Sequence, residues 1–319
     1  MSRANGDDKD RSTRDLAARA AWLSMVGGLT QDQIAAELGI SRQRTQRLVA
    51  RATAEGLVRV RIDHPIAECL ELERALQARY GLAQAWVAPG VGEGHDGLPA
   101  FAAPVLERMF QASTPQTFAF GTGRTLRAVI EQMHAVDGAQ HKFVSLIGNV
   151  GPDGSASFYE IIMRVADKTS GAHYPLAIPV FAQSDEELAL YRSLPHVKAA
   201  RDLAKMADMA IVGIGQLGPD APLRDDGFIT TAQLDDLRAA GAAGELCGQI
   251  FDAQGKFLEH PLNGKFVGIR VPIEGMPVTG IGGGPAKVPA IRAALAGRLL
   301  SGLITDEGTA RALLSADAT

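Results

Sequence analysis

Cysteine is scarce in this sequence of 319 residues, and long apolar runs are absent. The two cysteines, Cys69 and Cys247, lie far apart in the chain, which argues against a disulfide framework and against a cysteine-based metal site. No apolar run approaches the roughly 18 residues of a membrane-spanning helix, and the polar start lacks the apolar core of a signal peptide. We therefore predict a cytoplasmic protein with a disordered tail over residues 1–12.

The motifs of common catalytic sites are missing as well. The sequence contains neither GxSxG nor HExxH, and its seven histidines include no pair at metal-ligand spacing. General acid–base catalysis needs two titratable groups placed together, and the sequence shows no convincing pair. We therefore predict that the protein is not an enzyme and holds neither a metal nor a cofactor.

Charge is distributed unevenly along the chain, whose net charge is −4. Between Arg11 and Arg61, nine arginines stand against four acidic residues, whereas the rest of the chain is acidic. A small basic front end on a larger acidic body indicates two domains with different partners. The basic front end suits nucleic acid.

The front end has the pattern of a winged helix-turn-helix, which we assign to residues 13–62. A helix is expected over residues 15–26, and Thr30 with Gln33 forms a capping box for a second helix. Gly39 supplies a left-handed turn, and Ser41 caps the third helix. The alternation over residues 57–62 predicts the strand of a wing. A plain three-helix bundle is the alternative, but it requires no polar front on its third helix.

The front of the third helix carries side chains that can read base edges. In helix-turn-helix proteins this part enters the major groove, where Arg pairs with guanine, Gln with adenine, and Ser or Thr with either. The predicted DNA contacts are Ser41, Arg42, Gln43, Thr45, Gln46 and Arg47. Arg59 and Arg61, on one face of the predicted wing, are expected near phosphates.

Residues 63–319 read as an α/β domain. A helix over residues 66–80 follows the front end as a linker, and strand-like and helix-like segments then alternate to the end of the chain. Strands are expected at 84–89, 142–151, 174–179 and 209–215, at the start of TFAFGTGRTLRAVIEQM (117–133), and in ELCGQIFD, FVGIRV and MPVTGIGGG. This alternation predicts a largely parallel sheet covered by helices.

Two strands end in glycine-rich turns that lead directly into helices. Ligands of parallel sheets bind at the carboxyl ends of strands, and a helix N-terminus attracts anions. In GIGGGPAKVPA, Lys287 is expected in the first helical turn, which disfavours a cation unless an anion is present. The spacing matches neither the P-loop nor the dinucleotide fingerprint. Packing glycines and a solvated lysine are the alternative interpretation.

From these turns and from polar residues near other strands we predict a ligand site. Its residues are Gly121, Thr122, Gly123, Arg124, Thr125, Gly148, Asn149, Asp208, Glu245 and Lys287. Arg124 offers a planar fork that suits phosphate. Asp208 and Glu245 either hydrogen-bond sugar hydroxyls or serve as caps and solvated side chains.

Both parts of the chain together resemble the SorC-type (sorbitol-operon) family of bacterial transcriptional regulators. In front, the resemblance is carried by LTQDQIAAELGISRQRTQRLVARATAEGLVRVRI. In the body it is carried by FGTGRTLRAVIEQM, FVSLIGNVG, ADMAIVGIGQLG, GELCGQIFDAQG and TGIGGGPAKVPAIRAALAGRLLSGLITDEGTARALL. The resemblance implies a Rossmann-like effector domain, related to the sugar-phosphate isomerase and CoA-transferase folds but without catalysis.

The resemblance also implies partners and site roles. Family members bind operator DNA under control of a sugar, polyol or phosphorylated sugar, and they form homodimers or homotetramers. By position, residues 121–125 resemble the family's phosphate site. Lys287 resembles the lysine that meets the ligand phosphate or, in one branch, its carbonyl carbon, whereas Asn149 stands where relatives often have glycine. The segment RAAWLSMVGGLTQ is similar to regulators of polyol catabolism, such as that of erythritol.

Two other functions stay open at this point. One is a sugar-phosphate isomerase or aldolase fused to a DNA-binding domain, for which Asp208 and Glu245 would supply acid–base groups. The other is a constitutive architectural DNA-binding protein that responds to no effector.

Overall fold

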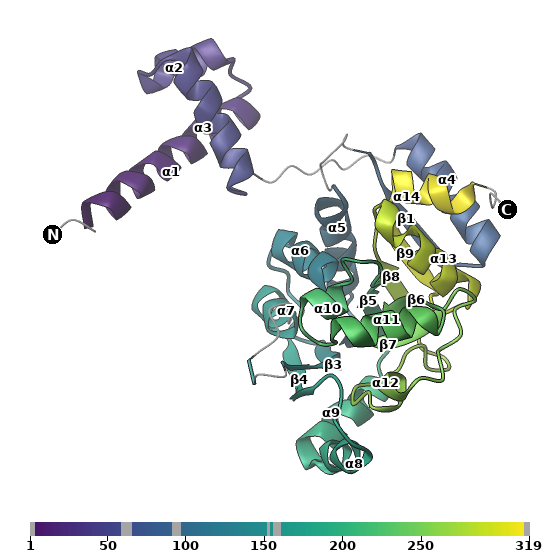
Figure 1. Cartoon of the computed structure of the whole chain (residues 1–319). Coiled ribbons are helices and arrows are strands. Elements are labelled where there is room, and N and C mark those ends of the chain that lie inside the picture. Colours follow the sequence, from purple (N-terminus) through teal and green to yellow (C-terminus); the bar gives the residue numbers. More distant parts are fainter. Residues whose placement is uncertain (1–3, 59–65, 91–96, 152–153, 156–160, 316–319) are drawn as a thin grey trace. The chain divides into compact units, whose positions relative to one another are not determined.

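The computed structural model describes residues 4–58, 66–90, 97–151, 154–155 and 161–315 (Figure 1). The chain divides into two compact units, Met1–Asp63 and His64–Thr319. The division falls one residue beyond the predicted boundary between the DNA-binding domain and the effector domain. No helix in the described part of the chain combines the length and the apolar character needed to cross a membrane.

Three helices make up the first unit: α1 (Ala4–Met25), α2 (Gln31–Leu38) and α3 (Arg42–Ala54). Its core combines small residues of α1 with larger ones of α2 and α3: Ala17, Ala20, Ala21, Ile34, Leu48 and Ala52. The alanines let α1 approach its two neighbours closely, so that a unit of this size still has a closed core.

The predicted turn and caps are confirmed. The Thr30 hydroxyl accepts a hydrogen bond from the Gln33 backbone N–H (3.4 Å), and the Gln33 side chain accepts one from the Thr30 N–H (2.8 Å). Gly39 ends α2 with φ 64°, and the Ser41 hydroxyl accepts from the Arg44 N–H at 3.3 Å. These local bonds define where α2 ends and where α3 begins.

One expectation for the first unit differs from the structure, and another falls largely outside the described residues. A disordered tail was predicted for residues 1–12, whereas in the structure α1 begins at Ala4. A polar sequence does not prevent this, since adding residues to a helix that has already nucleated costs little free energy. The predicted wing over residues 57–62, with Arg59 and Arg61, lies largely outside the described residues.

The second unit is built on a parallel sheet of seven strands, which confirms the predicted α/β class. In order across the sheet, the strands are β1 (Gln84–Ala88), β9 (Gly302–Asp306), β8 (Val278–Ile281), β5 (Met209–Gly213), β2 (Thr117–Phe120), β3 (Lys142–Val150) and β4 (Ala172–Pro179). Every neighbouring pair in this sheet is parallel, as expected where helices cover both faces.

Side chains alternate between two cores, one on each face of the sheet. Ala119 of β2 packs into one core, and its neighbours Phe118 and Phe120 pack into the other. The first face is covered by α4 (Ala67–Tyr80), α9 (Pro195–Lys205), α13 (Val288–Ala296) and α14 (Glu307–Leu314). The second is covered by α5 (Leu98–Phe110), α6 (Arg124–Gln132) and α7 (Ile162–Thr169). The result is a three-layer, Rossmann-like arrangement.

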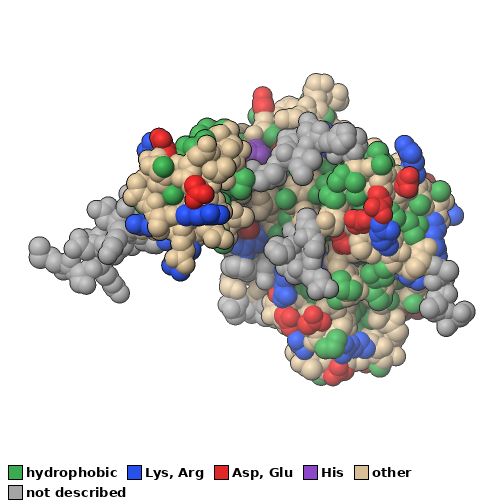
Figure 2. Space-filling view, turned by 90° about the horizontal axis from the view of Figure 1, so that it is seen from above, with side chains coloured by type: hydrophobic (Ala, Val, Ile, Leu, Met, Phe, Trp, Pro, Cys, Tyr) green, Lys and Arg blue, Asp and Glu red, His purple; other side chains and the backbone are tan. Residues whose placement is uncertain are grey.

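The remaining elements lie outside these layers. They are the helices α8 (Asp185–Ser193), α10 (Pro222–Asp225), α11 (Thr231–Ala239) and α12 (Pro261–Gly264), the short 3₁₀ helix η1 (Pro285–Lys287), and the antiparallel hairpin β6 (Ala242–Leu246) and β7 (Gln249–Asp252). The segment ELCGQIFD therefore folds back on itself rather than forming one strand. On the face seen in Figure 2, acidic and basic side chains lie interspersed rather than in one broad patch.

The strand predicted in FVGIRV is wrong. The Val267 N–H donates to the Val180 carbonyl (3.0 Å), whereas the Ile269 N–H donates to the Leu146 carbonyl of β3 (2.8 Å). The segment thus changes its partner after two residues and forms no ladder. Its apolar residues are buried because it crosses beside β3, which the sequence pattern alone does not distinguish from membership in the sheet.

Candidate functional site

Helix α3 presents a polar face made largely by the residues predicted to contact DNA. Arg42, Gln43, Gln46 and Arg47 are exposed. Arg42 forms an ion pair with Asp32 of α2, with 3.5 Å between Nη1 and Oδ2. Ser41 is exposed as well, although its hydroxyl serves as the cap of the helix. This face can therefore offer both arginine forks and glutamine amides to a duplex.

Thr45 does not belong to this face. It is completely buried, it shares one side of α3 with Leu48, and its hydroxyl donates to the Ser41 carbonyl at 3.3 Å. Helical periodicity explains the error, because residues 45 and 48 lie three positions apart on one face. Arg44, which is not among the predicted contacts, is exposed beside this buried position.

The carboxyl edge of the sheet contains a topological switch point between β2 and β5. From β2 the chain continues to β3 and β4 on one side, whereas from β5 it continues to β8 and β9 on the other. Ligands of open α/β sheets bind at such points. The turn Gly121–Thr125 follows β2, and Gly215 follows β5 closely, so the first predicted glycine-rich turn lies at the switch point.

Lys287 joins the two glycine-rich turns. Its Nζ donates a hydrogen bond to the Thr125 hydroxyl at the start of α6, with 2.8 Å between the atoms. Lys287 ends the short helix η1 and directly precedes α13, so it does not lie within the first α-helical turn as expected. Residues 162 positions apart are thereby in direct contact at the carboxyl edge.

Glu245 of β6 lies beside the same edge. Its backbone exchanges two hydrogen bonds with Gly215, of 3.1 and 3.0 Å. Its side chain covers Gly215 so closely that a Cβ on Gly215 would collide with the Glu245 carboxylate. The carboxylate also accepts a hydrogen bond from the Gly248 N–H at 2.6 Å. Glycine at position 215 is therefore required by the close approach of Glu245.

The surroundings of Glu245 alter its titration. Burial raises the pKa of Glu245 above its ordinary value, because a charged carboxylate loses hydration there. The hydrogen bond from Gly248 and the positive charge of Lys287 lower the pKa, whereas the negative charge of Asp226 raises it further. Glu245 and Lys287 thus interact electrostatically at the carboxyl edge, and we call this place beside the switch point the crevice.

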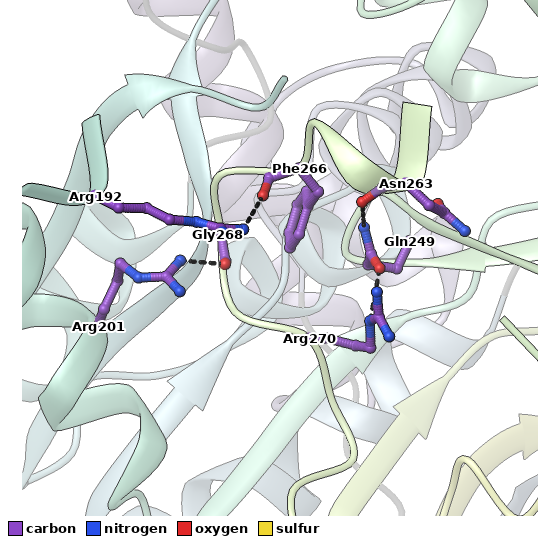
Figure 3. Close-up of a pocket in the computed structure, with 7 residues that line it drawn as sticks. All are labelled: Arg192, Arg201, Gln249, Asn263, Phe266, Gly268 and Arg270. Atoms are coloured by element: carbon purple, nitrogen blue, oxygen red, sulfur yellow. Dashed lines mark hydrogen bonds between the residues drawn. The ribbon is translucent and has the colours of Figure 1, made fainter. Parts of the chain in front are cut away.

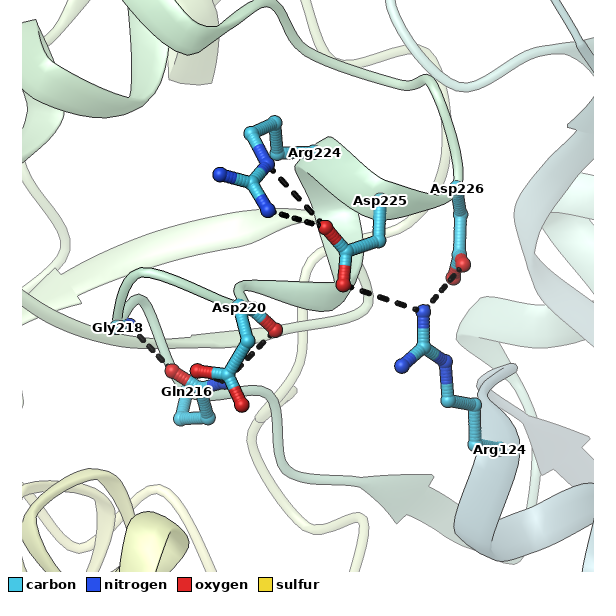
Figure 4. A network of polar contacts seen from close by, with 7 residues as sticks. All are labelled: Arg124, Gln216, Gly218, Asp220, Arg224, Asp225 and Asp226. Carbon is cyan, nitrogen blue, oxygen red and sulfur yellow. Dashed lines mark hydrogen bonds and ion pairs between the residues drawn. The ribbon is translucent and has the colours of Figure 1, made fainter.

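Arg124 is engaged by two carboxylates (Figure 4). Its Nη2 lies 2.8 Å from Asp226 Oδ1 and 3.7 Å from Asp225 Oδ2, and Asp225 pairs in turn with Arg224 at 2.5 Å. The aspartates stand at the end of α10, in the segment that follows β5. Neither aspartate is among the predicted site residues, although the run RDDG follows a strand that ends in glycine.

A second polar contact ties down the loop between β5 and α10 (Figure 4). Gln216 Nε2 donates to the carbonyl and to the Oδ1 of Asp220, at 3.0 and 3.1 Å, and Gln216 Oε1 accepts from the Gly218 N–H. Since this loop leads to the aspartates that hold Arg124, its rigidity helps to place them.

The turn of the β6–β7 hairpin covers the end of β2. A Cβ on Gly121 would lie 2.9 Å from the sulfur of Cys247, which is tighter than a normal contact. Cys247 is buried, and this burial raises the pKa of its thiol far above the ordinary value, so it stays protonated. Gly121 is therefore explained by packing against Cys247.

The structure moves one predicted residue out of the site. Asp208 precedes β5 and lies at the amino edge, where its carboxylate accepts a hydrogen bond from the Thr117 N–H at 2.7 Å. It is therefore not part of the crevice around Lys287. Gly148 lies in β3, where a Cβ would collide with the carbonyl oxygens of Ile178 and Pro179, so packing explains this glycine. Asn149 follows it, half-buried in the same strand.

No metal site adds to this arrangement within the ranges that the structure describes. There, no group of three or more His, Cys, Asp or Glu side chains is placed to hold a metal ion. The crevice thus brings together Thr125 and Lys287, which share a hydrogen bond, with Glu245 and with Arg124, which pairs with Asp226. Such a set of mixed donors and acceptors suits a ligand rich in hydroxyl groups.

Comparison with known proteins gives a matching family model for each of the two units. The Sugar-bind family model, a sugar-binding domain, matches residues 64–315, and a model of the MarR family matches residues 20–65. The erythritol catabolism regulatory protein EryD of Brucella abortus is 37% identical over 305 residues, which cover 94% of this chain and 96% of EryD. The transcriptional regulator LsrR of Klebsiella pneumoniae is 31% identical over 309 residues, covering 94% of this chain and 93% of LsrR.

A solved structure matches along almost the whole chain. The full-length sorbitol operon regulator SorC from Klebsiella pneumoniae has a TM-score of 0.70 and 27% identity, and the match covers 95% of this chain and 99% of SorC. The predicted combination of a DNA-binding helix-turn-helix with a sugar-binding α/β domain is confirmed, as is the resemblance to regulators of polyol use. The chain is a sugar-responsive DNA-binding regulator, and it belongs to the SorC-type family of transcriptional regulators.

Proposed function

We propose that a small polyol binds in the crevice at the carboxyl edge of β2, β5 and β8, and that its binding changes the affinity of α3 for operator DNA. The observation that carries this proposal is the hydrogen bond from Lys287 to Thr125, at 2.8 Å. It joins two glycine-rich turns at the switch point, so a ligand placed there contacts both turns at once. A shift between the two turns is then a route by which occupancy reaches the rest of the protein.

The charge balance of the crevice favours an uncharged effector. Three cations, Arg124, Arg224 and Lys287, stand beside three carboxylates, Asp225, Asp226 and Glu245, so the charges balance. A phosphate group would have to displace Asp226 from Arg124 or accept its repulsion. Hydroxyl groups both donate and accept, so a polyol can bind to the charged set as it stands. A phosphorylated sugar is the alternative.

The name of a relative suggests which polyol to test first. EryD, which is 37% identical to this chain, is named for erythritol catabolism. A four-carbon polyol is therefore the first compound to test as effector.

For DNA we propose contacts from the exposed face of α3. The contacting residues are Ser41, Arg42, Gln43, Arg44, Gln46 and Arg47. Arg47→Ala is expected to weaken operator binding about tenfold, because a bidentate arginine contact is worth about 1–3 kcal/mol. Effector binding should be unchanged in this variant. Unchanged operator affinity at physiological salt would contradict the assignment of α3.

We further propose that the protein acts in the cytoplasm as a homodimer or homotetramer. Operator sites are commonly palindromic, and two recognition helices must then reach two half-sites one helical turn apart. Sedimentation of the full chain with a selected duplex tests the number of copies that bind.

The decisive experiment measures operator affinity with and without effector. Duplexes are first selected from a random library with the purified chain, and fluorescence anisotropy then follows binding in erythritol, in erythritol phosphate and in a panel of sugars. We expect erythritol to change the affinity at least tenfold. A response to the phosphate ester alone would overturn the uncharged effector, and no response to any compound would overturn effector control.

Enzymatic turnover is the second candidate function. The observation in its favour is Glu245, whose pKa is raised by burial and which interacts with Lys287. We propose that this pair binds hydroxyl groups and performs no chemistry. Incubation of the pure protein with phosphorylated tetroses and pentoses tests this, and formation of an isomer or a cleavage product would establish an enzyme.

A further inference from the structure

A cavity of about 290 Å³ is lined by the seven residues drawn in Figure 3, none of which belongs to the crevice around Lys287. Its lining comes from α8, α9, β7, α12 and the segment that follows α12, and it shares no residue with the crevice. Three of its seven lining residues are arginines: Arg192, Arg201 and Arg270. Arg192 and Arg201 lie on the consecutive helices α8 and α9, whereas Arg270 comes from the segment that follows α12.

Few of the N–H groups of these arginines are used by the protein. Arg192 donates to the Phe266 carbonyl at 2.7 Å, and Arg201 donates to the carbonyls of Val267 and Gly268. The Arg270 Nε donates to the side chain of Gln249 at 2.7 Å. A guanidinium has five N–H donors, so each arginine keeps further donors for a ligand.

The positive charge of the cluster is not balanced nearby. Within the described residues, none of the three arginines forms an ion pair with a carboxylate, although Asp202 acts on Arg201 from a greater distance. Burial and the neighbouring charge of Arg270 lower the pKa of Arg192, and burial together with Arg192 lowers that of Arg201. The arginines are thus close enough to repel one another, a cost that a bound anion would relieve.

We propose that this cavity binds a small molecule that carries a phosphate group. Arg192 and Arg270 are exposed at its rim and Arg201 is half-buried, so a ligand from solvent can reach all three. Guanidinium groups from three directions suit the oxygens of a tetrahedral phosphate better than the two oxygens of a planar carboxylate. A volume of about 290 Å³ suits a small metabolite rather than a dinucleotide.

This site does not depend on the proposed effector function. The turn of the β6–β7 hairpin stands between the two places, because Cys247 packs against Gly121 whereas Gly248 packs against Phe266. The crevice pairs its cations with carboxylates and this cavity does not. The two places therefore select ligands of different charge.

A structural role competes with ligand binding for two of the arginines. Arg192 and Arg201 satisfy backbone carbonyls of the segment 266–268, so changing either one would disturb the fold. Arg270 is different, since it contacts the side chain of Gln249 and lies 5.0 Å from the centre of the Phe257 ring. Arg270 is thus the position at which phosphate binding can be tested with the least disturbance.

The test is isothermal titration of inorganic phosphate into the full chain at constant ionic strength. Arg270→Gln should weaken phosphate binding at least tenfold, because one charge-assisted contact is lost. Arg270→Lys should lie between this variant and the wild type. The exposed Arg108→Gln of α5 is the matched control, and Lys287→Met reports on the effector crevice, so both should bind phosphate as the wild type does.

Three results would overturn the proposal. One is no phosphate binding by the wild type at millimolar concentration. Another is loss of binding in Lys287→Met with binding kept in Arg270→Gln, which would place the phosphate in the crevice. A third is citrate binding more tightly than phosphate through Arg270, which would make the site one for carboxylates. If Arg270→Gln melts earlier than Arg108→Gln, the Arg270→Lys titration decides.

Discussion

The two glycine-rich turns of the sheet look alike in sequence, but the structure uses them differently. In the second turn, the Gly284 N–H donates to Asp306 (2.9 Å) and to Thr309 (2.8 Å), so the protein's own side chains occupy it. In the first, α6 begins behind Gly123, which has no side chain to cap the helix. The second turn is thus filled by the protein's own side chains, whereas the first turn presents the start of α6 to the crevice.

This difference explains why a lysine is tolerated directly before α13 without a bound anion. The carboxylate of Asp306 holds the backbone of the second turn, and Glu245 interacts electrostatically with the lysine. Negative charge near the start of α13 is therefore supplied by the protein itself. The second turn contributes its lysine to the crevice, and its glycines serve the contact with Asp306.

A side chain at Gly283, where the second turn makes room for Asp306, should have the largest effect on stability. A Cβ on Gly283 would collide with the Asp306 carboxylate, which also caps α14. We expect Gly283→Ala to lower the free energy of unfolding in urea by about 2–3 kcal/mol, as overpacking and a lost cap do. Gly264→Ala, where a Cβ meets nothing within 4 Å, is the control. Equal stability of the two variants would contradict the role of Asp306.

A substitution in the first turn should cost less stability, and a second substitution should restore part of the loss. In Gly121→Ala the new Cβ would lie only 2.9 Å from the Cys247 sulfur. We expect a loss of about 1–2 kcal/mol, part of which Cys247→Ala restores in the double variant because it removes the sulfur. A double-mutant cycle in urea measures this coupling. Strictly additive losses would show that the backbone of β5, not Cys247, limits the space.

The link between the turns should matter for the effector more than for the fold. Lys287→Met and Thr125→Val each remove one partner of the same hydrogen bond. Each should weaken erythritol binding about tenfold, and the double variant should be no worse than either single one. Calorimetry measures the affinities, and Lys142→Met at the amino end of β3 is the matched control. Fully additive losses would mean that the two residues act separately.

The smallest effect concerns the charge of Glu245. Burial raises the pKa of Glu245 in the folded state. Ionisation of Glu245 therefore destabilises the folded protein as pH rises through that pKa, and this cost is absent at pH values below the pKa of Glu245 in the unfolded chain. Glu245→Gln should therefore melt at a higher temperature than the wild type at pH 8, with a difference that shrinks toward pH 4. Exposed Glu259→Gln is the control. A difference that grows toward acid pH would reverse the assigned cause.

Much of the fold could be predicted because its signals are local. The capping box at Thr30, the turn at Gly39 and the cap at Ser41 depend on residues three or four positions apart, and all three were predicted correctly. The parallel sheet followed from alternating strands and helices. Two errors were avoidable from the same patterns, since Thr45 shares the period of Leu48, and Asp208 stands before a strand rather than after it.

The candidate site was predicted only in part. Turns after strands were identified because strand direction brings carboxyl ends to one edge. Which side chains meet across that edge depends on strand order, and strand order is not written in any local pattern. Asp225 and Asp226 were missed for this reason, although the glycine-rich turn that carries Arg124 was found.

The sequence by itself determined the caps and turn of the helix-turn-helix, the α/β class and the family, because these depend on short-range periodicity and on motifs in order along the chain. The tertiary structure alone decided that Lys287 meets Thr125 across 162 positions, that Asp226 holds Arg124, and that Arg270 joins Arg192 and Arg201 in the lining of one cavity. The physical reason is that such contacts arise from packing of whole elements, whose mutual positions depend on the core on both faces of the sheet.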